Sequence, residues 1–77
     1  MTPAEFDKRI ILSRQTYHRY KAMMDNWQWP KDDLHLFSQE ILHLNVLVQD
    51  FPEKAEKVAR IVDDWKELWR RLRAKMN

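Results

Sequence analysis

The chain contains no glycine among its 77 residues. Average usage would supply about five in a chain of this length. Because tight hairpins and phosphate-binding loops draw on glycine, β-rich folds and nucleotide-binding loops are disfavoured. The chain also lacks cysteine, which excludes disulfides, thiolate metal sites and thiol nucleophiles. We therefore expect a single domain over residues 1–77, built mainly from helices.

The first predicted helix covers residues 3–24. Thr2, Pro3 and Glu5 form a strong start, because the Thr hydroxyl and the Glu carboxylate can cap the first turn while Pro at N1 loses no hydrogen bond. Behind this start, steps of 3 and 4 residues join Phe6, Ile10, Ser13, Tyr17, Tyr20 and Met24. This spacing predicts one core-facing stripe, in which Ser13 is a small core residue rather than a nucleophile.

The same spacing recurs in two further segments. Residues 31–50 are predicted to form a helix whose stripe is Leu34, Phe37, Ile41, Leu44, Val48 and Phe51; residues 52–75 form another with Ala55, Val58, Val62, Trp65, Trp69, Leu72 and Met76. A strand over residues 44–48 is the competing interpretation, which the surrounding heptads disfavour. Pro30 and Pro52 mark the breaks, and Asp50 and Glu53 are candidate caps for the last helix.

These three segments predict an all-α fold, an antiparallel up-down-up three-helix bundle, and a dimer of that bundle stays open. The topology places the first connection beside the end of the last helix. Trp27 and Trp29 lie in this connection, outside any heptad, and we expect them near Met23, Met24, Leu34, Trp69, Leu72 and Met76. Either the two rings plug the end of the core, or one plugs it while the other is presented for binding.

Tryptophan and arginine are enriched at binding hot spots, so the candidate partner contacts are Trp27, Trp29, Arg70 and Arg73. Trp65 and Trp69 occupy heptad positions and are expected in the core. On the second helix, Leu42 and Val46 point almost opposite the core stripe, among uncharged neighbours. They are either a partly exposed aliphatic pair or a self-association contact.

Catalytic signals are weak. His18, His35 and His43 lack the spacing of a helical metal pair, since His35 and His43 lie two turns, or about 12 Å, apart. Adjacent carboxylates such as Asp32 and Asp33 diverge on a helix. We therefore expect no enzymatic activity, no metal and no cofactor.

Nucleic-acid binding is the main alternative. The net charge is only +2, but cations gather toward both ends of the chain. If the first and third helices run parallel, the basic groups meet at the end that holds Trp27 and Trp29, where acidic residues also lie. The cations concerned are Arg14, Arg19, Lys21, Lys66, Arg70, Arg71 and Arg73.

No apolar stretch reaches the ~18 residues of a membrane span, and the first residues lack the pattern of a secretory signal. A membrane-surface role for the basic, Trp-containing last helix is a weaker option, because its apolar face has a protein core available. The sequence thus predicts a small cytoplasmic protein–protein interaction module, such as an adaptor, an inhibitor or a small subunit.

Overall fold

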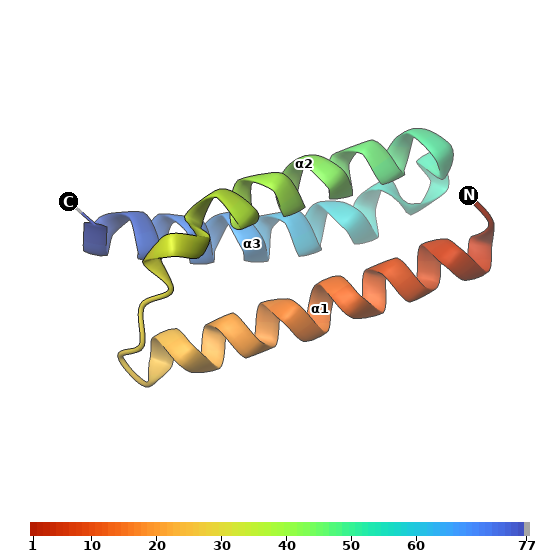
Figure 1. Cartoon of the computed structure of the whole chain (residues 1–77). Helices are drawn as coiled ribbons and strands as arrows, with labels where there is room; N and C mark the ends of the chain where they lie inside the picture. The colour runs from red at the N-terminus through yellow and green to blue at the C-terminus, as the bar shows by residue number, and fades with distance from the viewer. Residues whose placement is uncertain (77) are drawn as a thin grey trace.

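The computed structural model describes residues 1–76. Within them the chain forms α1 (Pro3–Asp25), η1 (Lys31–Asp33), α2 (Leu34–Asp50), η2 (Pro52–Lys54) and α3 (Ala55–Met76). The three α-helices run up, down and up in one elongated bundle of 38 × 19 × 18 Å, shown in Figure 1. The predicted all-α three-helix bundle is confirmed, and the run 44–48 is helical rather than extended.

The helix starts differ in how they are built. At α1 the predicted capping box is confirmed, because the Glu5 amide donates to Thr2 Oγ1 over 3.2 Å and the Thr2 amide donates to Glu5 Oε1 over 3.3 Å. By contrast, α2 and α3 each follow a short 3₁₀ turn, so both α-helices begin about three residues later than expected. These turns are short because 3₁₀ hydrogen bonds have poorer geometry than α-helical ones.

The predicted capping of the last helix by Asp50 and Glu53 is wrong. The residue before Pro52 is Phe51, which takes the cap position with φ −134° and makes no side-chain cap hydrogen bond. Its ring packs on Phe6, with 4.9 Å between centroids. A buried aromatic contact therefore fixes this junction, and α2 continues through Asp50.

The helices are joined by two kinds of core contact, one mainly aliphatic and one mainly aromatic. The most extensive interhelical contact joins α2 to α3, which lie side by side in Figure 1 through aliphatic residues such as Leu44, Val58 and Val62. α1 meets this hairpin through larger rings. Trp65 lies at their centre, with Phe37 at 5.4 Å and both Tyr17 and Tyr20 at 6.1 Å between centroids. The aromatic layer therefore holds α1 against one side of the α2–α3 hairpin.

Ser13 makes this aromatic layer possible. It is buried, as predicted, and its Oγ accepts a 3.0 Å hydrogen bond from Trp65 Nε1. A small side chain on α1 leaves room for the indole, and the hydroxyl satisfies the buried indole N–H. Ser13 thus provides both the space and the hydrogen-bond acceptor that the buried Trp65 indole requires.

The core stripe of α3 is turned toward α1 relative to the predicted one. Trp65 is buried as expected, but Trp69 is only half-buried, and Ala55 and Met76 are exposed. Ile61 and Leu68 are buried instead. The shift follows from α3 packing against two helices at once, which gives it a wider apolar face than a single heptad seam. Among residues 1–76, no helix combines the length and hydrophobicity that crossing a membrane would need.

Candidate functional site

The backbone at the end of α1 has an unusual conformation. Asn26 is the C-cap, the Gln28 amide donates to the Met23 carbonyl over 2.9 Å, and the Trp27 amide donates to the Met24 carbonyl over 3.1 Å. This pair of hydrogen bonds is a Schellman motif. The motif needs a left-handed residue directly after the cap, and Trp27 supplies it with φ +61°. In most proteins glycine occupies this position.

Trp27 is costly at this position. A left-handed conformation brings the Cβ of an L-residue too close to the following carbonyl, which costs roughly 1–2 kcal/mol. Within residues 1–76, Trp27 is the only residue with a positive φ angle. Burial does not compensate, because Trp27 is 75% exposed. Trp29 is instead half-buried and packs against the edge of the core. The two rings thus have different environments, with Trp29 at the core and Trp27 presented to solvent.

A lysine from α3 lies against both rings. Lys75 Nζ is 5.2 Å from the ring centroid of Trp27 and 5.2 Å from that of Trp29. The two indoles meet edge to face, with 6.2 Å between centroids. Cation–π attraction of this kind is worth about 0.5–1 kcal/mol at an exposed site. The lysine therefore restrains the orientation of the exposed ring without burying it.

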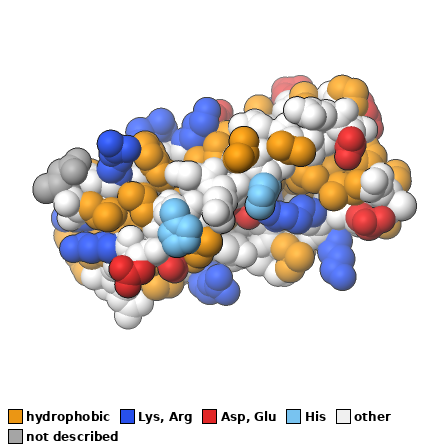
Figure 2. Space-filling view, turned by 45° about the horizontal axis from the view of Figure 1, so that its top comes forward, with side chains coloured by type: hydrophobic (Ala, Val, Ile, Leu, Met, Phe, Trp, Pro, Cys, Tyr) orange, Lys and Arg blue, Asp and Glu red, His pale blue; other side chains and the backbone are white. Residues whose placement is uncertain are grey.

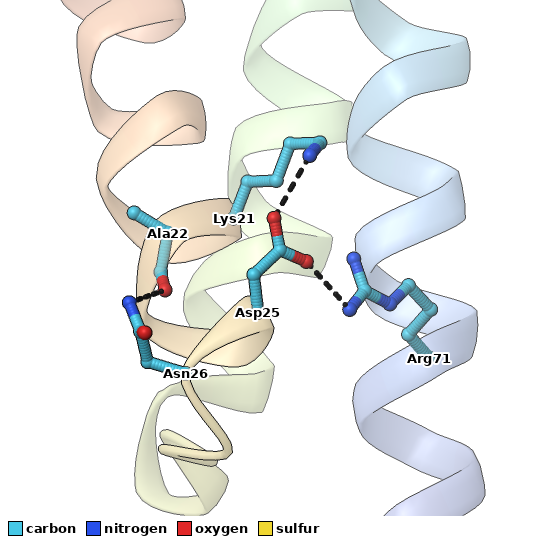
Figure 3. Close-up of polar contacts among 5 residues, drawn as sticks. All are labelled: Lys21, Ala22, Asp25, Asn26 and Arg71. Carbon is cyan, nitrogen blue, oxygen red and sulfur yellow. Dashed lines mark hydrogen bonds and ion pairs between the residues drawn. The ribbon is translucent and has the colours of Figure 1, made fainter.

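Asp25 joins the corner to α3 (Figure 3). Its Oδ2 accepts from Lys21 Nζ over 2.9 Å, and its Oδ1 accepts from Arg71 Nη2 over 3.0 Å. Next to it, the side-chain amide Nδ2 of Asn26 donates to the Ala22 carbonyl over 2.9 Å. The hydrogen bond from Lys21, followed by the one from Arg71, lowers the pKa of the Asp25 carboxyl below its ordinary value of 3.8. The carboxylate is thus charged at neutral pH and ties the end of α1 to α3.

A second polar contact fixes the far end of the connection. The Tyr20 hydroxyl donates to Asp33 Oδ2 over 3.0 Å, which attaches η1 to α1. Burial of the phenol, and then its hydrogen bond to Asp33, raise the pKa of Tyr20 above 10.0. Both ends of the connection are therefore anchored, and the position of Trp27 is set by fixed neighbours.

An open hollow of about 230 Å³ lies beside the exposed ring. It is lined by Met24, Asp25, Trp27, Trp29, Arg71 and Lys75, which we call the tryptophan corner. Such a hollow can receive one side chain of another molecule next to the Trp27 ring. Its rim carries two cations and one carboxylate, so the rim has a net positive charge.

The structure separates the four predicted partner contacts. Trp27 and Trp29 lie in the tryptophan corner, whereas Arg73 lies over the Trp69 ring, 4.9 Å from its centroid. Arg70 borders a different hollow of about 350 Å³, together with Ser38, Ile41, Lys66 and Trp69. The cations at the corner are Arg71 and Lys75, and neither was among the four predicted partner contacts; Arg71 was predicted only for the nucleic-acid alternative. Their spacing of four residues, which puts both on one face of α3, was the available signal.

The cations of the nucleic-acid alternative are also dispersed. Arg14 borders a cavity with Glu53, Glu56 and Asp64, and Arg19 lies over the Tyr20 ring at 5.5 Å. Lys21 and Arg71 share Asp25, and Arg70 pairs with Glu67 over 3.0 Å. The basic residues therefore point to several faces, and acidic groups accompany most of them.

The outer face of α2 exposes the predicted aliphatic pair. Leu42 is 62% exposed and Val46 is 50% exposed. His18, His35 and His43 are all at the surface, and within residues 1–76 no group of three or more His, Asp or Glu side chains is placed to hold a metal ion. Comparison of the chain with protein-family models, curated proteins and solved structures gave no match.

Proposed function

We propose that the protein is a small protein–protein interaction module that binds its partner through the tryptophan corner. The observation that carries this proposal is Trp27, which combines a strained left-handed backbone with an exposed side chain. Backbone strain that burial of the side chain does not offset is typical of functional positions. A tryptophan ring that is presented on a fixed backbone also loses little entropy when it becomes buried in an interface.

The rim of the corner indicates the chemistry of the partner. Lys75 and Arg71 flank the exposed ring, and Asp25 is already shared between two cations. A partner that offers an apolar socket with carboxylates at its edge would bury the indole and pair with both cations. The module thus acts by occupying a site on a larger protein, as an adaptor, an inhibitor or a small subunit does.

Nucleic-acid binding has less support. A phosphate backbone needs cations along one continuous face, because the neutralised phosphates supply most of the affinity. Here Arg14 and Arg19 border cavities on different sides of α1, with acidic residues in each. Lys66, Arg70 and Arg73 are the remaining cluster, and they lie away from the exposed ring.

The test compares Trp27→Gly with Ile11→Gln. Ile11 is a matched control because it is another exposed hydrophobic residue, 56% accessible, in the middle of α1. Wild type and each variant are used to capture partners from extract of the native cells, with and without nuclease treatment. We expect wild type and Ile11→Gln to recover the same protein and Trp27→Gly to lose it while remaining folded. Equal recovery by all three, or loss of every partner upon nuclease treatment, would contradict the proposal.

A further inference from the structure

One side of the α2–α3 hairpin has no covering helix. α1 packs on the side that carries Trp65 and Ile61, where it buries Tyr17 and Tyr20. The hollow that contains Trp69 is lined by residues of α2 and α3 alone. It therefore lies on the opposite side, which we call the back face. Trp69 and Ile41 are half-buried there, so the hairpin exposes apolar surface on the side that α1 leaves open.

The α2 half of the back face carries no charge. Steps of 3 and 4 residues join an exposed stripe, and Val46 lies beside it. The stripe consists of His35, Ser38, Leu42, Asn45 and Gln49. An uncharged stripe can pack against an identical stripe without opposing like charges, which a charged one cannot. Leu42 and Val46 lie in its middle.

The α3 half of the back face is charged, with the two signs separated. The same spacing joins Glu56, Ala59, Asp63, Lys66, Arg70 and Arg73, all of them exposed. Within the stripe the anions occupy the first half and the cations the second. Beside the stripe, Arg60 pairs with Glu56 and Glu67 pairs with Arg70. Along the upper edge of Figure 2, blue side chains gather mostly on the left and red ones on the right. Within residues 1–76 neither Asp63 nor Lys66 has an ion-pair partner.

We propose that the back face is the interface of an antiparallel homodimer. A two-fold axis perpendicular to the helices lays α2 on α2 and α3 on α3 of a second copy, in opposite directions. If the axis passes between residues 64 and 65, Asp63 faces Lys66 of the second copy. The same axis sets Glu56 opposite Arg73. Every charge pair formed in this way is attractive, and each occurs twice.

The charged stripe of α3 sets the position of the axis. Ser38 and Ile41 border the same hollow as Lys66 and Trp69, whereas the Phe37 ring lies 5.4 Å from the Trp65 ring. Because the helices are antiparallel and rise equally per residue, residue 44 of α2 lies level with α3 between about residues 58 and 64. An axis between residues 64 and 65 therefore lays the uncharged stripe of α2, with Leu42 and Val46, against the same stripe of the second copy.

A parallel two-fold arrangement does not fit this face. It would lay the uncharged stripe of α2 on the charged stripe of α3, and both sets of charges would be covered without partners. A partner of different sequence would not need the self-complementary order of signs along α3. The second copy is thus the occupant that this charge pattern favours.

The proposal is tested by reversing the charge of Asp63 or of Lys66 and measuring dimerisation by sedimentation at high micromolar concentration. Wild type should form a dimer. In Asp63→Lys two pairs of like cations meet, and in Lys66→Asp two pairs of like anions meet, so each variant alone should dimerise at least about tenfold more weakly. An equimolar mixture should recover the dimer, because the introduced lysine of one chain faces the introduced aspartate of the other.

Asp64→Lys is the control, since it makes the same charge change on a residue that borders the cavity with Arg14 instead. It should dimerise like wild type, and so should Trp27→Gly, which separates this proposal from the one on the tryptophan corner. Circular dichroism checks that each variant is folded. A monomeric wild type, dimers that survive both exchanges, or a mixture of folded variants that stays monomeric would each overturn the proposal.

Discussion

Trp65 and Trp27 place the same side chain in opposite surroundings. Trp65 is 1% exposed, lies within a helix, and has its indole N–H bonded to Ser13. Trp27 is 75% exposed and lies on a left-handed backbone. The contacts of Trp65 account for its presence through stability alone. Trp27 contacts Trp29 and Lys75 but stays exposed, and this difference is the basis of the role proposed for it in a contact outside the chain.

Replacement of Trp65 by alanine should have the largest effect. Removing a buried tryptophan costs about 3–5 kcal/mol, which is comparable with all the stability that one core of this size supplies. We expect Trp65→Ala to be largely unfolded in circular dichroism at room temperature, whereas Trp27→Ala keeps wild-type helicity. A folded Trp65→Ala with a near-native melting temperature would show that the contacts of Trp65 do not stabilise the bundle as described.

Ser13→Ala should have an intermediate effect. It leaves the indole N–H of Trp65 buried without an acceptor, which costs about 1–3 kcal/mol. Thermal unfolding of Ser13→Ala, Trp65→Phe and the double variant measures the coupling between the two side chains. We expect the double variant to lose clearly less stability than the two single variants together. Additive losses would show that the hydrogen bond contributes little to the burial of the indole.

Replacement of Asp25, which pairs with Lys21 and Arg71, should have a smaller and pH-dependent effect on stability. Because the pKa of Asp25 is lowered in the folded state, its contribution is complete above 3.8 and falls as the pH drops from 3.8 through the lowered pKa. Melting temperatures of wild type and Asp25→Asn should therefore differ at neutral pH and converge in acid. A difference that is constant between neutral and strongly acidic pH would mean that the ion pairs with Lys21 and Arg71 do not form.

The sequence predicted the features that depend on local periodicity. Every member of the α1 stripe, from Phe6 to Met24, is buried or half-buried, because helical spacing alone decides which face meets the hairpin. It did not predict which side of α3 would face α1, since that choice depends on two neighbouring helices. The hydrogen bond between Ser13 and Trp65 joins residues 52 positions apart, and no local pattern encodes it.

In the tryptophan corner too, the sequence predicted what depends on the local pattern and missed what depends on tertiary packing. The sequence located two tryptophans outside the heptads, and the topology placed them beside the end of the last helix. The left-handed backbone at Trp27 could not be foreseen, because residues at this position of a Schellman motif are usually glycine and the chain has none. Lys75 was missed because its contact with both rings depends on how far α3 extends along the corner.

The melting temperature of Trp27→Gly, measured beside Trp27→Ala, tests most directly whether Trp27 is held at a cost to the fold. Glycine relieves the left-handed backbone, although it gives the unfolded chain more freedom and removes the contact with Lys75. These contributions nearly cancel, so the free energy of unfolding should stay within about 0.5 kcal/mol of the wild-type value, a few degrees at most in a domain of this size. We expect Trp27→Gly to melt close to wild type and clearly above Trp27→Ala. A fall of several degrees in Trp27→Gly would show instead that the ring stabilises the bundle, and would contradict the account.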